Sequence, residues 1–374
     1  MTQITNHSEI QKKSFRRQNK RSFFASLAWG ILAFIFMMGS LEVLAHTKYI
    51  NKVFLTRSVG SYHTQFEIKW FALQHYVDKN HGVDVVILGN SMVNTGIDPV
   101  IFEDKYYSLS GEKLRVFNFG VEALTVEPLS VLAQLINERY HPGTIILFTE
   151  MRDYIADNGT EVTRQFLDNS WMRYQMGIPS LEGYLVDHTA IFKYLLTWRN
   201  WSSASFLDDQ RTVLYRQANV TPQGYEPDRN QDVFDPSQPS VVDPAQRDKF
   251  ALAANFEIAP SRALNLQEVI SLNTTGVHVI VTEMPVYPTY FAYFGPASVR
   301  TQYLQDLGLL VQNAGGVFVS AIPYTDIPLS GRVDDHHLNV DGAPIFSELL
   351  AEQLYTACEN HQSCIYPASS DTQP

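Results

Sequence analysis

The sequence has very few cysteines, which limits the sites it can form. Only Cys358 and Cys364 occur among its 374 residues, and their pattern is not one that ligates a metal. They lie close together near the C-terminus. In an oxidising compartment they could form a disulfide, or they could remain unpaired thiols. We expect neither a metal nor a cofactor.

Positive charge is scarce over most of the chain. There are 28 Lys and Arg residues against 39 Asp and Glu residues, a formal net charge of −11. Residues 1–21 carry six basic residues and one acidic residue, a net charge of +5, which leaves −16 for the rest. Nucleic-acid binding depends on cations that neutralise phosphates, so we expect no nucleic-acid partner.

Charge is absent between Phe23 and Leu41. A helix of about 20 apolar residues spans the hydrocarbon layer of a membrane, and the basic residues before it favour a cytoplasmic N-terminus. We predict a basic cytoplasmic stub at 1–21 and a transmembrane signal anchor at 22–45, with the rest periplasmic or on the cell surface. A signal peptide cleaved near residues 43–45 is the alternative. No later run is long and apolar enough to return through the membrane.

Short apolar runs alternate with helical patterns after this anchor, and no internal repeat is present. Runs typical of buried strands lie at 84–88, 114–120, 144–148, 277–281 and 317–322, and helical patterns lie at 129–136, 263–272, 303–311 and 343–355. This alternation predicts an α/β fold, a three-layer α/β/α sandwich with a mostly parallel sheet.

Four boundaries follow from the same patterns. Residues 46–80 are amphipathic and predict a helical connector, and residues 81–366 predict the α/β domain. An insertion at about 155–250, rich in Asn, Asp, Pro, Gln and Trp, interrupts the domain. We expect it to carry a few helices and to shape a cleft. Residues 367–374 are predicted to be a disordered tail.

A single serine follows the first apolar run, in Gly89-Asn90-Ser91. Functional groups of parallel sheets collect at the carboxyl ends of the strands. A Gly there permits a sharp turn, and a serine at the start of the next helix has backbone N–H groups beside its hydroxyl. The pattern fits a nucleophile, and it also fits a serine that caps a helix.

The segment 333–342 could complete a nucleophilic site. A hydrolytic serine needs a base, and the base needs a carboxylate that holds the correct imidazole tautomer. Asp334 and His337 are three residues apart, which can bring the carboxylate to the ring. A polar loop with a helix cap at Asn339 or Asp341 is the alternative interpretation.

Three motifs together resemble the SGNH, or GDSL-like, family of esterases and acyltransferases. The family has a Gly-x-Ser turn after strand one, an oxyanion glycine after strand two and an Asp-x-x-His block before the last helix. Gly89-Asn90-Ser91, Asn118-Phe119-Gly120 and the block 334–337 match these. The resemblance covers roughly residues 82–155 and 262–357.

The resemblance assigns roles to these residues. It implies that Ser91 is the nucleophile, that His337 is the base and that Asp334 orients His337. The Asn118–Gly120 motif would line the oxyanion site, where the amides of Ser91 and Gly120 would bind the negative charge. His336 and its neighbour Asp335 would be plain loop residues.

One motif departs from the family. Its third block is usually Gly-x-Asn-Asp, whereas this chain has Glu150-Met151-Arg152-Asp153 with no Asn. It resembles an Arg-Asp variant found in some membrane-anchored members. Arg152 could stabilise the oxyanion or hold a charged substrate, or it could pair at the surface with Asp153 or Glu150. Glu283 and Tyr287, after the fourth strand, could line the cleft.

The resemblance implies a membrane-anchored, extracytoplasmic serine esterase or O-acyltransferase. Anchored members resemble proteins that acetylate alginate or D-alanylate teichoic acid beside a membrane-bound O-acyltransferase. This implies an acylated cell-envelope polysaccharide, or another ester, as substrate and such an acyltransferase as partner. The missing Asn motivates a second hypothesis, a catalytically inactive SGNH-like domain that binds glycan or scaffolds an envelope-assembly complex.

Overall fold

Five apolar runs pair into one parallel sheet. The computed structural model describes residues 5–47, 56–156, 160–230, 232–238, 256–291, 294–360 and 364–368. The strands are β1 (Val85–Gly89), β2 (Val116–Gly120), β3 (Thr144–Phe148), β4 (His278–Thr282) and β5 (Val317–Phe318), in the order β2-β1-β3-β4-β5. Gly89 pairs with Gly120, so the carboxyl ends of β1 and β2 meet at one edge.

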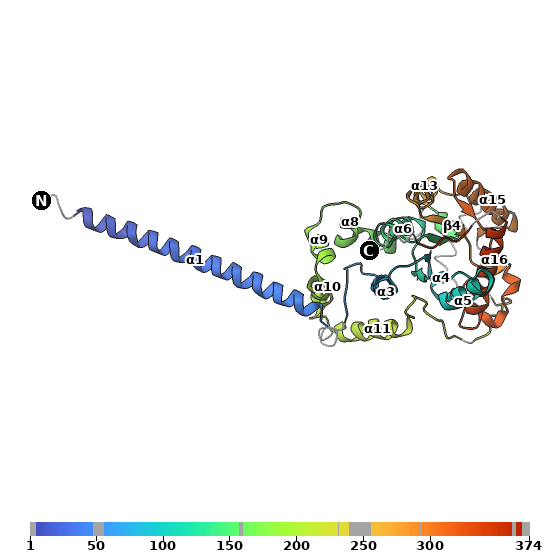
Figure 1. Ribbon diagram of the computed structural model, residues 1–374, viewed down its shortest axis with the longest axis horizontal. Coiled ribbons are helices and arrows are strands. Elements are labelled where there is room, and N and C mark those ends of the chain that lie inside the picture. The colour runs from blue at the N-terminus through green and yellow to red at the C-terminus, as the bar shows by residue number, and fades with distance from the viewer. Residues whose placement is uncertain are drawn as a thin grey trace.

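Helices cover both faces of this sheet (Figure 1). The main ones are α3 (Thr64–Asn80), α4 (Ser91–Gly96), α5 (Pro99–Ser110), α6 (Val126–Tyr140), α13 (Pro260–Ser271), α15 (Ala297–Asn313) and α16 (Gly342–Glu359). Helix α5 packs on α16, and α6 packs on α13, which also contacts α15. The predicted three-layer α/β/α architecture is confirmed, because apolar strands buried on both faces need a helical layer on each side.

Strand β5 is shorter than the run 317–322 predicts. It lies at the edge of the sheet, and only Val317 and Phe318 pair with β4 as strand residues. The Val319 N–H still donates to the Val281 carbonyl at 2.9 Å. Beyond it the chain approaches Pro323, which has no N–H to donate to a ladder.

The connector predicted at 46–80 is helical only from Thr64. Residues 56–63 are not helical, because Gly60 (φ 77°) and Tyr62 (φ 58°) adopt left-handed backbone that a right-handed helix cannot include. The His63 side chain then accepts the Phe66 N–H and caps α3. Residues 48–55 lie outside the described part of the chain.

The insertion predicted at about 155–250 holds a series of short helices. They are α7 (Thr160–Asp168), α8 (Ser170–Gln175), α9 (Leu181–His188), α10 (Ala190–Thr197), η2 (Trp198–Asn200) and α11 (Phe206–Asn219). Helix α10 contacts α1 and α11 contacts α3. Helix α7 contacts α6 of the α/β domain, and α8 and α9 link α7 to α10. Residues 239–250 lie outside the described residues.

The N-terminal helix α1 (Thr5–Ala45) projects from the domain (Figure 1). Its segment Phe23–Ala45 has a mean hydropathy of 2.0, and none of its most apolar 18-residue stretch is buried by the rest of the chain. Among the described residues it is the one helix long and apolar enough to cross a membrane. This makes α1 the candidate for the anchor.

The chain near its C-terminus is tied to the sheet. Cys358 and Cys364 form a disulfide, which decides between the two alternatives left open by the sequence. The Ala368 N–H donates to Asp84 at 3.0 Å, and Pro367 lies against Gly143. The first two residues of the predicted disordered tail are therefore packed, and residues 369–374 lie outside the described residues.

The remaining short elements lie between the strands and the helices already named. They are η1 (Met151–Tyr154), η3 (Leu272–Thr275), α14 (Pro288–Phe291), η5 (Tyr324–Asp326) and η6 (Leu329–Gly331).

Candidate active site

Ser91 is the first residue of α4, directly after β1. The preceding residue, Asn90, is the cap of this helix, because its side-chain oxygen accepts the Met92 N–H at 3.0 Å. The alternative in which Ser91 caps the helix is therefore wrong. The hydroxyl of Ser91 remains available for another partner at the carboxyl edge of the sheet.

Close packing, rather than a sharp turn, explains the glycines at the ends of β1 and β2. Neither Gly89 nor Gly120 has a positive φ angle, so the predicted need for unusual backbone angles is wrong. A Cβ atom on Gly89 would lie 2.4 Å from the Val93 side chain, and one on Gly120 would lie 2.3 Å from the Asn94 backbone nitrogen. Both residues let α4 approach the sheet closely.

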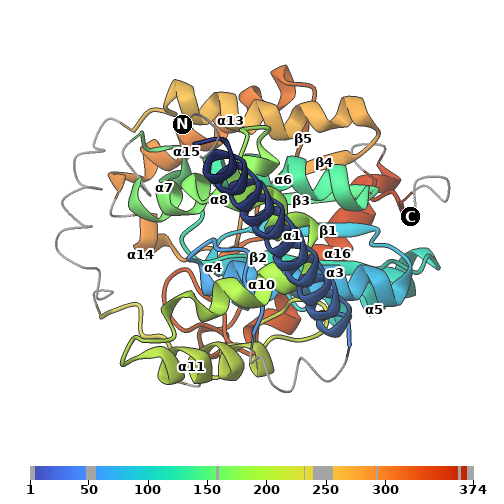
Figure 2. The ribbon, with the colours of Figure 1, turned by 90° about the vertical axis from the view of Figure 1, so that its left-hand side faces the viewer.

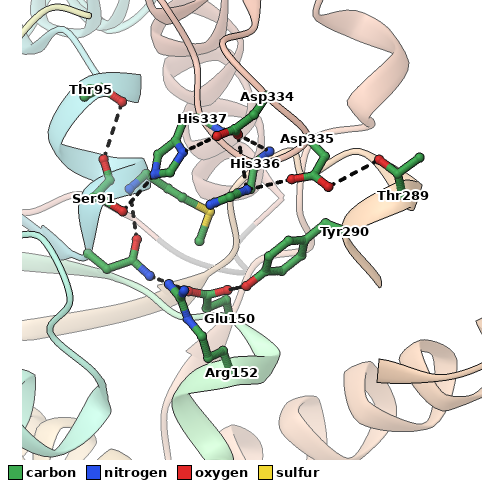
Figure 3. Close-up of polar contacts among 12 residues, drawn as sticks. Ser91, Thr95, Glu150, Arg152, Thr289, Tyr290, Asp334, Asp335, His336 and His337 are labelled. Atoms are coloured by element: carbon green, nitrogen blue, oxygen red, sulfur yellow. Dashed lines mark hydrogen bonds and ion pairs between the residues drawn. The ribbon is translucent and has the colours of Figure 1, made fainter. Parts of the chain in front are cut away.

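Three predicted residues form a continuous hydrogen-bonded chain (Figure 3). Ser91 Oγ lies 2.8 Å from His337 Nε2, and His337 Nδ1 lies 2.8 Å from Asp334 Oδ2. The other carboxylate oxygen of Asp334 accepts the backbone N–H groups of His336 and His337, at 2.8 and 2.7 Å. Residues separated by 246 positions thus meet in the order serine, histidine and aspartate.

The environment of Asp334 keeps its carboxylate ionised. Burial alone would raise its pKa, but the hydrogen bond from His337 and the nearby imidazoles of His336 and His337 outweigh burial, and the pKa lies well below its usual value. A permanently charged carboxylate at Nδ1 leaves Nε2 of His337 as the atom that can accept a proton from Ser91.

His336 belongs to a second hydrogen-bonded pair. Its Nδ1 lies 2.7 Å from Asp335 Oδ1, and its ring packs between Tyr290 and His337, with centroid distances of 4.9 and 4.0 Å. Burial opposes protonation of His336, but Asp335 and Asp334 outweigh burial and raise its pKa. Asp335 is fully buried. The prediction that these two are plain loop residues is therefore wrong.

Glu150 stands where the family has its third-block residues, and it organises the floor of the site. It accepts hydrogen bonds from Asn90 Nδ2 at 2.7 Å, from Arg152 at 2.6 Å and from the Tyr290 hydroxyl. The negative charge of Glu150 raises the pKa of Arg152. Arg152 thus pairs with Glu150, but with a buried carboxylate rather than at the surface.

Neither Glu150 nor Tyr290 is among the predicted site residues. The available signal for Glu150 was its place directly after β3, since side chains at the carboxyl ends of parallel strands converge. Tyr290 lies on α14, in a segment without a family motif, and only the folded chain brings it to Glu150.

Asn118 and Gly120 do not form the predicted oxyanion site. The Asn118 amide group donates to the carbonyls of Val93 and Ile97, both at 2.7 Å. Its side-chain oxygen accepts the Gly120 N–H at 2.9 Å. Because a backbone nitrogen has a single proton, the Gly120 N–H would have to share or break this bond to hold an oxyanion. Both residues instead fix the position of α4.

Glu283 and Tyr287, the weaker cleft candidates, have other partners, although the Tyr287 N–H donates to the Asp335 carbonyl at 2.7 Å, beside the candidate site. Glu283 is buried, and its carboxylate lies 3.5 Å from Arg300. Tyr287 packs against Phe234 and Tyr324, with ring centroids 5.4 and 4.9 Å apart. Burial, only partly offset by Arg300, raises the pKa of Glu283 to about 7.

Replacing Glu283 with Gln should stabilise the protein at about pH 8 by about 1–3 kcal/mol and leave its stability near pH 4 unchanged. The folded chain holds this proton up to about pH 7, whereas the unfolded chain loses it near the ordinary pKa of 4.5. Native stability is therefore full at low pH, falls between these values and stays lower above them. Urea unfolding of both proteins at the two pH values measures the difference, with the exposed Glu348→Gln as control. An equal effect at both pH values would contradict the prediction.

A large cavity lies away from this site. It has a volume of about 1360 Å³ and is bounded by α3 and α11, with Phe71, Gln210 and Pro222 among its lining residues. Ser91, Asp334 and His337 do not line it. The hydrogen-bonded chain of Ser91, His337 and Asp334 is therefore separate from this cavity.

Asp334, His336 and His337 could also be considered as metal ligands. Their ligand atoms lie within 4.8 Å of one another. However, both ring nitrogens of His337 are already hydrogen-bonded, to Ser91 and to Asp334. A metal ion bound to His337 would have to break one of these bonds, so the arrangement fits a nucleophilic serine better than a metal centre.

Comparison with solved structures finds weak likenesses. One is a Streptococcus pneumoniae protein with the provisional name platelet activating factor, at 11% identity and a TM-score of 0.33, covering 76% of this chain and 92% of that chain. Two are catalytic mutants of Axe2, an acetylxylan esterase from Geobacillus stearothermophilus. They are 10% identical, cover 73% of this chain and 94% of the other, and have TM-scores of 0.33 and 0.32. No family model and no curated protein matches the chain. Likenesses at this level decide neither its family nor its activity.

Proposed function

We propose that this protein is a membrane-anchored, extracytoplasmic serine esterase or O-acyltransferase of the SGNH type. The observation that carries the proposal is the Ser91–His337–Asp334 chain, with 2.8 Å at each side-chain contact. These distances fall within the range over which a base can take a proton from a nucleophile. The apolar helix Phe23–Ala45, preceded by basic residues, supports the anchor and a cytoplasmic N-terminus.

The geometry supports a two-step acyl transfer. Ser91 Oγ attacks the carbonyl carbon of an ester, and its proton passes to His337 Nε2. The C–O bond to the alcohol then breaks, and His337 returns the proton to the leaving oxygen, which leaves an acyl-serine. In the second step His337 takes a proton from water or from a sugar hydroxyl, and the oxygen of that group attacks the acyl carbon. The bond between the acyl carbon and Ser91 Oγ then breaks, and His337 returns the proton to Ser91 Oγ. Hydrolysis and transfer differ only in this acceptor.

The oxyanion formed in each step needs hydrogen-bond donors that stabilise its negative charge. The Ser91 N–H, at the start of α4, is one candidate. Arg152 is the other, held beside the site by Glu150, which also accepts a hydrogen bond from Asn90 next to the nucleophile. Arg152 would replace the Asn of the family's third block. The acyl ester of a cell-envelope polysaccharide and a membrane-bound O-acyltransferase partner complete the proposal and rest on the family resemblance.

A second candidate function is a glycan-binding or scaffolding domain without catalysis. Two observations favour it: the engaged Gly120 N–H and the absence of the third-block Asn, in whose place Arg152 is paired with Glu150. With fewer oxyanion donors the tetrahedral intermediate would be poorly stabilised.

A fluorophosphonate probe should label the full-length protein in detergent, and Ser91→Ala should abolish the labelling. The probe forms a covalent bond only with a serine whose proton is removed by a base. Labelling is measured by gel fluorescence, with the exposed Ser108→Ala as matched control and with a chelator present to exclude a metal requirement. Absence of labelling in the wild type, or equal labelling of Ser91→Ala, would favour the non-catalytic function.

A further inference from the structure

The insertion helices α9, α10 and η2 present large apolar side chains to solvent beside the end of α1. Leu195 at the end of α10 is 44% exposed, Trp201 just after η2 is 68% exposed and Leu207 at the start of α11 is 61% exposed. Leu181, at the start of α9, is 76% exposed. Single exposed apolar residues are common on proteins, but a group of this kind in one region marks an interaction surface.

This apolar surface is continuous with the contact between α1 and α10. Ile191 and Tyr194 of α10 pack against Ala45, with Met38 and Leu41 beside them. The Glu42 carboxylate accepts the N–H groups of Ala190 and Ile191 at 2.7 and 3.0 Å, which fixes the start of α10 against α1.

The surface then extends outward from α10. The ring of Trp198 lies 5.4 Å from the ring of Phe206, which precedes Leu207. Arg199 pairs with Glu182 at 2.5 Å, which joins η2 to the start of α9. Figure 2 looks at the side from which α1 projects and shows α8, α10 and α11 on that side.

The level of the membrane follows from the length of α1. Its apolar segment of 23 residues spans about 35 Å at 1.5 Å per residue, slightly more than the hydrocarbon layer. Residues 38–45, which contact α10, form the last two turns of this segment. With α1 spanning a membrane as in the proposed function, on which this inference rests, helix α10 and its neighbours would lie at the height of the lipid headgroups.

We propose that Leu181, Leu195, Trp198, Trp201 and Leu207 form a docking surface that inserts into the outer interface of the lipid bilayer that α1 spans. Trp prefers this interface because its ring is apolar and its N–H is polar. Helix α1 keeps this surface within one helical turn of the lipid. Contact between the surface and the bilayer is therefore effectively intramolecular. Docking would hold the domain in one orientation above the membrane.

Site-specific quenching in the full-length protein tests the proposal. The protein is reconstituted in vesicles of phosphatidylethanolamine and phosphatidylglycerol that contain a headgroup-proximal doxyl lipid. An NBD fluorophore is attached at Trp201→Cys or, as matched control, at Ser108→Cys on α5, while the native cysteines remain joined in their disulfide. We expect a blue shift and a loss of NBD fluorescence at position 201 and no loss at position 108.

Two further measurements keep the result interpretable. The double substitution Leu195→Glu and Leu207→Glu changes exposed residues only, so we expect an unchanged Tm and recovery of the fluorescence at position 201. Equal behaviour at positions 201 and 108 would overturn the proposal. So would a label at 201 that is shielded from aqueous iodide but not quenched by lipid, which would indicate a protein partner on this surface. These readouts report lipid contact rather than turnover, so they are independent of the proposed ester chemistry.

Discussion

Replacing His337 with Gln should lower the turnover of p-nitrophenyl acetate by roughly 10⁶-fold, the loss that follows removal of the histidine from other Ser-His-Asp sites. His337 Nε2 is 2.8 Å from Ser91 Oγ, so without it no base takes the proton of the nucleophile. Ser91→Ala should cause a similar loss. Because the two residues act as a unit, the double variant should be no slower than either single variant.

The adjacent histidine supplies the matched control for this experiment. His336 is bonded to Asp335 and packs against the His337 ring, but His337 is the residue in contact with Ser91. His336→Gln should therefore retain most of the activity, with a Tm measured for every variant. An equal loss in His336→Gln and His337→Gln would show that the assignment of the base is wrong. An additive loss in the double variant would show that Ser91 and His337 act in separate steps.

Replacing Gly120 with Ala should destabilise the protein by about 1–3 kcal/mol and reduce turnover by about 10²-fold. The added Cβ would lie 2.3 Å from the Asn94 nitrogen and 2.8 Å from the carbonyl carbon of Val93. These are backbone atoms of α4, so the helix must move as a body. Ser91 begins this helix, and a displacement of about 1 Å at a nucleophile has this catalytic cost.

Gly308→Ala is the appropriate control for the Gly120 variant. Its Cβ would lie 3.7 Å from the Phe318 ring, an ordinary contact, and Ala favours a helix interior by up to about 1 kcal/mol over Gly. We therefore expect Gly308→Ala to be neutral or stabilising with unchanged turnover. A Gly120→Ala protein with native Tm and native turnover would mean that α4 has room to accept the methyl group.

The central sheet could be predicted because its strands are continuous apolar runs. A strand such as 144–148 is buried on both faces, so nearly all of its side chains are apolar and the strand is recognisable in the sequence. The non-helical course of 56–63 was only partly predictable. Gly60 readily adopts its left-handed backbone, whereas Tyr62 is a residue type without that preference.

The part of the candidate site that could be predicted consists of residues a few positions apart in the sequence. Asp334 and His337 are three residues apart, and that spacing led to the contact now seen with Ser91. The oxyanion side was not predictable, because it depends on where an N–H points. Gly120 follows β2 as expected, yet its proton is bound by the Asn118 side chain, a contact that no sequence pattern reveals.

The distance in sequence between Ser91 and His337 also determines when the site can first exist. Ribosomes add about 5–20 residues per second, so the 246 residues that separate the two take roughly 12–50 s to synthesise. Strands β1, β2 and β3 can emerge and begin to pair within this interval, while Ser91 has no base. Under the proposed function, the nascent chain would have no base for Ser91 until His337 has been made and the last helix, α16, packs on α5, so chain order would delay ester attack until the domain is complete.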